Sequence, residues 1–351
     1  MSQDVWEARD TTPSQIEAAL RELLVRAYST DDAIVAARVL NVVVIVDAEF
    51  KGEVENRLER VGRYHPSRLI LCSVRPGRER LDARASMVAD GGAMQGSLAV
   101  ARERVEIEIG PQHLRTLDTI VDPLLVSDLA TVVWAPHGHR EGVDALQRLA
   151  QVVLIDSHDE PDLEVALCRA HDLAEDSYVV DLAWLRSTPW RERVAAAFDP
   201  PMLRPHLREI SGLTVRHRSD SEAAAMLFCG WLASRLGWRA ERLTSRGDEI
   251  AGRLRTRRGE VRVRLEPSAE LRSPGLGGVT LDMASGAMMS LDRGPGGLQA
   301  VRRGRKGPEQ RWTVLGASRG EGGILGEGVR QALLRDPTYR PALDAARAMV
   351  R

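Results

Sequence analysis

The segment RVLNVVVIV (residues 38–46) decides the fold class, because its apolar residues follow one another without alternation. A strand with one solvent-facing side alternates apolar and polar residues, whereas a strand buried on both faces is apolar throughout. The β-branched valines also favour a strand over a helix. The segment therefore predicts a strand that is buried on both faces of its sheet.

Helices and strands alternate on both sides of this segment. Upstream, Thr12 is placed as the N-cap of a helix, with Pro13 at its first position and Gln15 folding back to complete a capping box. Downstream, the periodicity predicts further helices and strands at residues 51–62, 68–74, 97–110, 113–125, 129–136, 140–150, 152–156 and 161–174. This alternation is typical of an α/β fold with a largely parallel or mixed sheet.

The pattern changes in the second half of the chain. Residues 219–237 predict a long helix with a second capping box, from Ser219 to Glu222, and residues 239–316 form short alternating runs with arginine between the apolar positions. Such runs predict antiparallel hairpins, followed by two closing helices. We expect an α/β N-terminal domain at residues 1–175 and an α+β C-terminal domain at residues 176–351, with an alternative boundary near residues 199–205.

Composition restricts the partners. The 351 residues are 43% hydrophobic and carry a net charge of −1, so the chain as a whole has no electrostatic attraction to nucleic acid or acidic lipid. Residues 239–320 contain 17 arginines and lysines against 9 aspartates and glutamates, an excess of 8 positive charges. That excess hints at an anionic partner, but Trp312 is the only aromatic residue there, which argues against nucleic acid. The acidic N-terminal residues and the lack of a long apolar run predict a soluble cytoplasmic protein with no membrane contact.

Residues with reactive or ligating side chains form no recognisable set. The glycine-rich segments at residues 275–278, 294–297 and 320–323 lack the spacing of nucleotide-binding loops, and the HGH segment at residues 137–139 lacks further metal ligands at a suitable spacing. Asp156 ends a predicted strand, where α/β proteins place ligands, but with Ser157 it is interpreted as a cap of the next helix. The three cysteines have no partner spacing and are interpreted as reduced. We predict no catalytic residue, metal or cofactor.

The segment DLAWLRSTPWRERVAAAFDPP (residues 181–201) holds two of the seven tryptophans. A helix is predicted at residues 189–198, with Trp190, Val194 and Phe198 on its buried face. Trp184 and Arg186 precede that helix and are expected to face outward. From composition alone, the cluster is a core corner, a protein interface or a catalytic site, and tryptophan and arginine are the residues most enriched in binding hot spots.

A second candidate is HPSR (residues 65–68), directly before a predicted strand. Arg68 is either a phosphate ligand or, by the preferred interpretation, a partner of a carboxylate beside a proline-stiffened turn.

Read together, these segments resemble the OpcA family, the glucose-6-phosphate dehydrogenase assembly proteins of actinobacteria and cyanobacteria. The resemblance covers nearly the whole chain and is loosest over residues 239–320. It rests on seven short pieces that occur in the family's order: WEARDTT, RVLNVVV, HPSR, PLLVSDLATVVW, VVLIDS, DLAWLRSTPWRERVAAAFDPP and GWLASRLGW, with DPTYRPAL closing the chain.

The resemblance implies a non-catalytic accessory protein of the pentose phosphate pathway. Its expected partner is glucose-6-phosphate dehydrogenase, whose assembly into the active oligomer it promotes. The candidate partner-binding residues are Trp184, Arg186, Arg191, His65 and Arg68. The alternative is an enzyme or sensor that binds a sugar phosphate in the α/β domain, with Arg68, Arg186 or Arg191 on the phosphate.

Overall fold

In the computed structural model, the apolar run at residues 38–46 forms strand β3 (Leu40–Asp47), and seven of its eight residues are fully or almost fully buried as predicted. The structure describes residues 3–30, 34–35, 38–62, 66–90, 99–247, 249–305, 308–315 and 320–351. Strand β3 pairs in parallel with β4 (Ser67–Val74) and β7 (Thr131–Trp134). Parallel partners on both sides explain why β3 needs no polar face.

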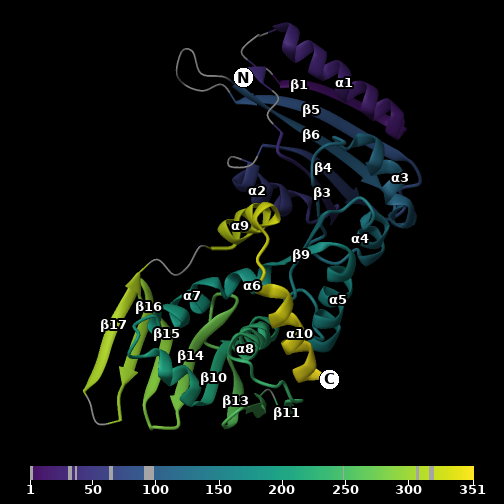
Figure 1. Ribbon diagram of the computed structural model, residues 1–351. Coiled ribbons are helices and arrows are strands. Elements are labelled where there is room, and N and C mark those ends of the chain that lie inside the picture. Colours follow the sequence, from purple (N-terminus) through teal and green to yellow (C-terminus); the bar gives the residue numbers. More distant parts are fainter. Residues whose placement is uncertain are drawn as a thin grey trace. The chain divides into compact units, whose positions relative to one another are not determined.

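The first sheet is mixed and has nine strands among the described residues, in the order β1-β5-β6-β4-β3-β7-β8-β9 with β2 paired to β6 (Figure 1). Its remaining strands are β1 (Gln3–Thr11), β2 (Ile34–Val35), β5 (Leu81–Asp90), β6 (Ala99–Ile109), β8 (Val152–Ile155) and β9 (Tyr178–Asp181). The helices of this part are α1 (Pro13–Thr30), α2 (Lys51–Gly62), η1 (Pro111–Thr116), α3 (Leu117–Val121), η2 (Asp122–Leu124) and α4 (Arg140–Leu146).

Helix α1 begins as predicted. The Gln15 side chain accepts the Thr12 backbone N–H at 3.0 Å, and the Thr12 hydroxyl accepts the Gln15 N–H at 3.4 Å. The helix packs on β1 and β5, two antiparallel strands at the edge of the sheet that the sequence did not predict. Their buried positions hold small residues such as Ala83 and Ala85, which carry little hydrophobic signal.

The second sheet consists of eight strands in the described residues, in the order β11-β12-β13-β10-β14-β15-β16-β17 (Figure 1). These are β10 (Ile210–Arg218), β11 (Thr244–Arg246), β12 (Glu249–Thr256), β13 (Gly259–Ser268), β14 (Leu276–Met283), β15 (Met288–Gly294), β16 (Gly297–Arg303) and β17 (Glu309–Leu315). The helices that belong with it are α5 (Leu163–Asp176), α6 (Leu182–Arg186), α7 (Thr188–Ala197), η3 (Arg204–Glu209), α8 (Glu222–Leu236) and α10 (Tyr339–Val350).

Antiparallel hairpins build this sheet, as predicted, with one parallel pairing between β10 and β13. Along β13, Val261, Val263 and Leu265 are buried whereas Arg262 and Arg264 are exposed. One face of the sheet therefore belongs to the core, and the arginines between the apolar positions lie on the other face.

Helices α8 and α10 form the centre of this half and pack directly on each other. Gly230 is at the crossing, where a Cβ atom would lie 2.2 Å from the carbonyl oxygen of Ala342. Helix α8 ends at Gly237, in the left-handed conformation that a C-terminal glycine favours. The predicted capping box is wrong: Ser221, not Ser219, is the N-cap, and its side chain caps no backbone N–H of the helix.

The predicted fold class is confirmed: both parts are layered α/β structures, with a mixed sheet first and antiparallel hairpins second. The contacts divide the chain into two compact units, residues 1–155, 176–180 and 325–334 in the first and the remaining residues in the second. We propose residue 175 as the domain boundary along the sequence, although residues 156–175 pack with the second unit and residues 176–180 return to the first. None of the helices in the described residues is both long and apolar enough to span a membrane.

Candidate functional site

The segment at residues 181–201 folds into two short consecutive helices of the second unit, α6 and α7, joined at Ser187. The predicted helix is confirmed as α7, whereas α6 was not predicted. Asp181 is the N-cap of α6, and its carboxylate accepts the Ala183 backbone N–H at 2.9 Å. Trp184 therefore lies within a helix and not in a loop before one.

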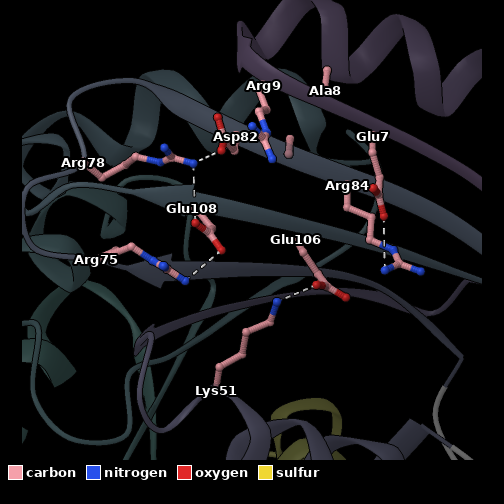
Figure 2. Close-up of a pocket in the computed structure, with 11 residues that line it drawn as sticks. Glu7, Ala8, Arg9, Lys51, Arg75, Arg78, Asp82, Arg84, Glu106 and Glu108 are labelled. Atoms are coloured by element: carbon pink, nitrogen blue, oxygen red, sulfur yellow. Dashed lines mark hydrogen bonds and ion pairs between the residues drawn. The ribbon is translucent and has the colours of Figure 1, made fainter.

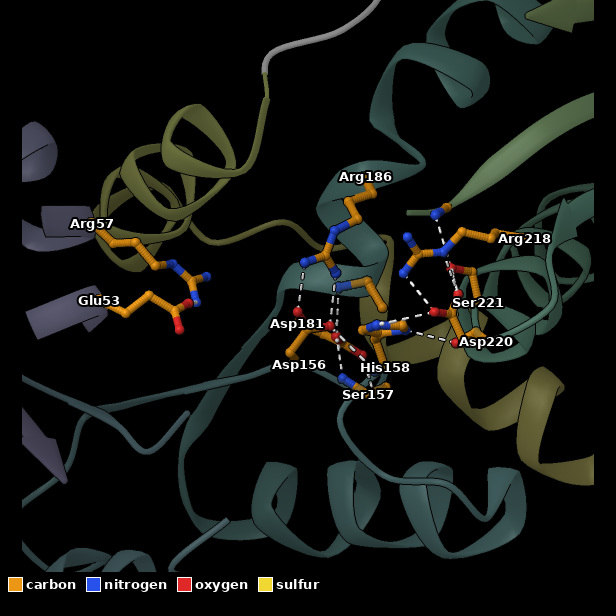
Figure 3. Close-up of polar contacts among 12 residues, drawn as sticks. Glu53, Arg57, Asp156, Ser157, His158, Asp181, Arg186, Arg218, Asp220 and Ser221 are labelled. Atoms are coloured by element: carbon orange, nitrogen blue, oxygen red, sulfur yellow. Dashed lines mark hydrogen bonds and ion pairs between the residues drawn. The ribbon is translucent and has the colours of Figure 1, made fainter. Parts of the chain in front are cut away.

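Asp181 is completely buried and is surrounded by hydrogen-bond donors. It accepts hydrogen bonds from the Ser157 hydroxyl at 2.5 Å and the Ser157 backbone N–H at 3.1 Å (Figure 3). It also accepts one from the Tyr339 hydroxyl at 3.2 Å. Loss of hydration, and then the negative charge of Asp156, raise the pKa of Asp181 to about 6, against the effect of these hydrogen bonds. Asp181 thus joins three segments that are far apart in the sequence.

Asp156 forms a bidentate ion pair with Arg186, with distances of 2.8 and 2.6 Å between guanidinium nitrogens and carboxylate oxygens (Figure 3). Both side chains are largely buried, with 7% of Arg186 and 6% of Asp156 exposed. The interpretation of Asp156 and Ser157 as a cap of the following helix is wrong. That helix, α5, begins at Leu163, and Asp162 caps it by accepting the Val165 N–H at 2.9 Å.

Trp184 and Arg191 form a stacked pair in the interior of the unit. The Arg191 guanidinium carbon lies 3.4 Å from the centre of the Trp184 ring, and the indole N–H donates to Asp336 at 2.9 Å. Loss of hydration lowers the pKa of Arg191 to about 10, although the nearby Asp336 favours its charged form. Burial alone would raise the pKa of Asp336, but hydrogen bonds from Thr338 and Trp184 and the charge of Arg191 lower it.

A further chain of polar contacts involves His158, which follows Asp156 and Ser157 in the sequence. His158 Nδ1 lies 2.6 Å from the Asp220 carbonyl oxygen, and the Asp220 carboxylate accepts from Arg218 and from the Ser221 hydroxyl (Figure 3). Ser221 in turn accepts the N–H of Gly275, which has a φ of +95°. No local sequence pattern marked this cluster, because the contacts that close it, His158 with Asp220 and Ser221 with Gly275, join residues 62 and 54 positions apart.

The expectation that Trp184 and Arg186 face outward is therefore wrong. Trp184 is 2% exposed, like Trp190, whose predicted burial is confirmed. Trp184 was expected to be exposed and Trp190 to be buried, because spacing along the chain reveals only the apolar face of α7, on which Trp190 lies. The cost of burying Trp184 is offset by partners in the distant segment 336–339, which local spacing does not reveal.

Arg68 has a separate environment in the first unit. It donates to Glu103 at 2.6 Å and to the Leu124 carbonyl at 2.8 Å, and it is 8% exposed. This agrees with the interpretation of Arg68 as the partner of a carboxylate, and that carboxylate, Glu103, is itself buried. Arg38 also contacts Glu103, so the carboxylate holds two guanidinium groups. His65 lies outside the described residues.

Among the hollows on the surface of the described residues, a pair with charged linings can be reached by ligands. The first, the charged groove, has a volume of about 740 Å³ and belongs to the first unit (Figure 2). Five cations and four carboxylates line it: Arg9, Lys51, Arg75, Arg78 and Arg84 with Glu7, Asp82, Glu106 and Glu108. Most are paired, for example Lys51 with Glu106 at 2.6 Å and Arg84 with Glu7 at 3.2 Å.

The second hollow, the arginine pocket, has a volume of about 540 Å³ and belongs to the second unit. It is lined by residues from the end of η3 and the start of β10, the end of α8, and the turn between β12 and β13: Leu207, Arg208, Ile210, Ser234, Arg235, Leu236, Gly237, Trp238, Thr256, Arg257 and Arg258. Its four arginines were not predicted as a site, because three separate segments supply them.

The buried cluster and the two hollows differ in what they can do chemically. In the cluster, the Asp156 and Asp181 carboxylates are already occupied by donors, so this arrangement fixes the chain rather than accepting a ligand. The hollows have solvent-facing charges and can bind polar ligands.

Comparison with known proteins gives a consistent result. Residues 43–172 match the family described as glucose-6-phosphate dehydrogenase subunit N-terminal domain of OpcA, and residues 177–343 match the corresponding C-terminal domain. An OxPP cycle protein OpcA of Synechococcus elongatus is 29% identical over 182 residues, which is 50% of this chain and 41% of that protein. The OpcA of Nostoc punctiforme is 28% identical over 183 residues, or 51% of this chain and 39% of its own length. The chain thus spans about two fifths of the length of these relatives.

Among solved structures, an aldose–aldose oxidoreductase from Caulobacter crescentus is similar over 88% of this chain and 95% of its own, with 11% identity and a TM-score of 0.46. At that identity and TM-score, the likeness says nothing about activity.

Proposed function

Because the chain belongs to the OpcA family of glucose-6-phosphate dehydrogenase subunits, we propose that it is a non-catalytic accessory protein that binds this dehydrogenase and promotes its assembly into the active oligomer. The family match carries the proposal, since it extends over residues 43–172 and 177–343 and so includes most of both units. The relatives' OxPP cycle names support a role in the oxidative pentose phosphate pathway, and we propose that the protein acts in the cytoplasm.

An assembly factor acts by binding the assembled enzyme more tightly than the dissociated one. If the dehydrogenase is mostly inactive alone, a shift to mostly active requires about 3–5 kcal/mol of differential binding. Two or three hot-spot contacts of about 2 kcal/mol each supply that amount. The contact surface therefore needs only a few well-placed aromatic or arginine side chains.

The buried signature residues enter this proposal as positioning residues. Trp184, Arg186 and Arg191 use their polar groups within the second unit, and Arg68 does so within the first. We infer that they influence partner binding by holding the surrounding surface in shape. Replacing them is then expected to weaken stimulation and stability together.

A titration of dehydrogenase activity with the purified chain tests the proposal. We expect turnover to rise and to level off at a fixed ratio of the two proteins, while the chain alone turns over neither glucose 6-phosphate nor a nicotinamide cofactor. Unchanged dehydrogenase activity and oligomeric state at saturating chain would contradict it.

A sugar-phosphate sensor is the second candidate, and the charged groove favours it. Cations beside carboxylates suit a ligand with a phosphate and several hydroxyl groups, because the carboxylates can accept from the hydroxyls. Arg9 lies in the groove and is exposed, and it forms no ion pair within the described chain (Figure 2). Arg68, Arg186 and Arg191, which the sequence suggested for the phosphate, are instead held by protein groups.

Calorimetry with glucose 6-phosphate decides between the two candidates. Binding that Arg9→Ala weakens would support a sensor in the charged groove. No heat at millimolar ligand would eliminate it.

A further inference from the structure

The arginine pocket gathers positive charge, and none of its described lining residues carries a negative charge. Arg208, Arg235, Arg257 and Arg258 line it together, and no carboxylate is among the described residues that line it. All four side chains are exposed, and within the described chain none forms an ion pair or a side-chain hydrogen bond. Glu209 is influenced by the charge of Arg258, but a hydrogen bond from His206 is the main cause of its lowered pKa.

The charged groove differs from the arginine pocket in its balance of cations and carboxylates. There, four carboxylates accompany five cations, and most groups are paired. Surface arginines in proteins are commonly balanced in this way, because like charges around one hollow repel each other. Four unbalanced guanidinium groups are a feature that an anionic ligand would neutralise.

The backbone that carries these arginines is fixed on two sides. On one side, the Trp238 N–H donates to the Ala233 carbonyl at 2.9 Å, and Trp238 is 8% exposed. On the other side, the Thr256 hydroxyl donates to Gly259 and accepts the Arg258 backbone N–H, both at 3.1 Å. The backbone that carries the guanidinium groups is therefore already held in place, so binding a ligand costs little backbone conformational entropy.

The rest of the lining identifies the kind of anion. Leu207, Ile210, Leu236 and Trp238 contribute an apolar wall, which suits a ligand with an apolar body beside its charges. Among the described residues that line the pocket, no carboxylate or amide side chain can accept from sugar hydroxyls.

We propose that the arginine pocket binds an acidic protein segment that carries aspartate or glutamate beside an apolar side chain. Planar guanidinium groups match carboxylates in a bidentate geometry, and arginine and tryptophan are typical of binding hot spots. The proposal rests on the proposed function in one respect, namely that glucose-6-phosphate dehydrogenase supplies this segment. It also accounts for part of the positive excess at residues 239–320, where Arg257 and Arg258 lie.

Charge reversal within the pocket tests the proposal against reversal elsewhere on the same sheet. The test variant is Arg257→Glu with Arg258→Glu. The matched control is Arg303→Glu with Arg305→Glu, two exposed arginines at the β16–β17 connection that cause the same change in net charge. Both variants and the parent chain are titrated with the dehydrogenase at 50 and 200 mM salt, after their melting curves have been shown to coincide.

The pocket variant is expected to raise the Kd for the dehydrogenase by about tenfold or more and to flatten its dependence on salt, while the control changes the Kd by less than about threefold. Equal losses in both variants, or no loss in either, would overturn the proposal. If the pocket variant melts earlier than the parent, Arg208→Gln with Arg235→Gln replaces it, because these residues lie outside the β12–β13 turn.

A second probe separates this proposal from the proposed function. Poly-L-glutamate and pyrophosphate are titrated into the full chain without any dehydrogenase. Binding of poly-L-glutamate that the pocket variant loses and the control keeps would support the site even if the dehydrogenase does not bind. Tighter binding of pyrophosphate than of poly-L-glutamate, or no binding of poly-L-glutamate to the parent, would refute it.

Discussion

Replacing Asp181 by asparagine should make the protein less sensitive to pH. The side chain is fully buried, and the raised pKa of Asp181, about 6 against an ordinary value of 3.8, means that the native state keeps this proton where the unfolded chain has lost it. Its effect on stability is therefore most favourable below pH 3.8 and is lost as the pH rises through 6. Asparagine has no such dependence.

The size of the effect follows from the two pKa values. A change from 3.8 to about 6 corresponds to about 3 kcal/mol of lost stability above pH 6. Asparagine retains the geometry, because its carbonyl can accept the N–H groups of Ser157 and Ala183 and its amide can donate to the Ser157 and Tyr339 hydroxyls. Any loss of unfolding free energy that comes from altered packing or hydrogen bonding is the same at every pH. It therefore cancels when the difference between variant and parent is compared at two pH values.

Urea unfolding of both proteins at pH 4 and pH 7.5 provides that comparison. The stability of Asp181→Asn relative to the parent should be about 2–3 kcal/mol more favourable at pH 7.5 than at pH 4. The exposed Asp199→Asn is the matched control and should differ from the parent by less than about 0.5 kcal/mol at both values. A relative stability of Asp181→Asn that is independent of pH would refute the account of this buried carboxylate.

Three further predictions concern packing and reactivity. Trp184→Ala should lower the free energy of unfolding by about 3–5 kcal/mol, because it removes a buried ring and leaves Asp336 without its indole donor; a melting curve like that of the parent would contradict its burial. Gly230→Ala should cost about 1–3 kcal/mol in urea unfolding, since its Cβ meets backbone on α10, whereas Gly326→Ala, which has open space around it, should be neutral or slightly stabilising. A thiol reagent should label Cys168 alone in the native protein, because burial raises the pKa of the other two thiols to about 12, and rapid labelling of three thiols without denaturant would show that these two are accessible.

Local pattern was sufficient for the elements that depend on nearby residues. The apolar run at residues 38–46 could only be a central strand, and Thr12 with Gln15 set the start of α1. The strand β5 was not predicted because alanine and serine occupy three of its buried positions, beside Leu81 and Met87, and the burial of such small residues depends on neighbouring strands.

The candidate site was less predictable, because its contacts join distant segments. Trp184 could be recognised as special from the sequence, but its partner Asp336 is 152 residues away, so its burial could not be inferred. The arginine pocket shows the same limit, since Arg208, Arg235 and Arg257 come together only after the sheet has formed. Spacing reveals which face of an element is apolar, and tertiary contacts decide which polar groups meet.

Sedimentation velocity of glucose-6-phosphate dehydrogenase from the same cells, with and without the purified chain, tests the central proposal most directly. We predict that the dehydrogenase shifts to a larger, active species that contains the chain at a fixed ratio, and that the pocket variant Arg257→Glu with Arg258→Glu produces this shift only at a higher concentration. Separate boundaries for the two proteins, with the dehydrogenase equally active in both samples, would contradict it.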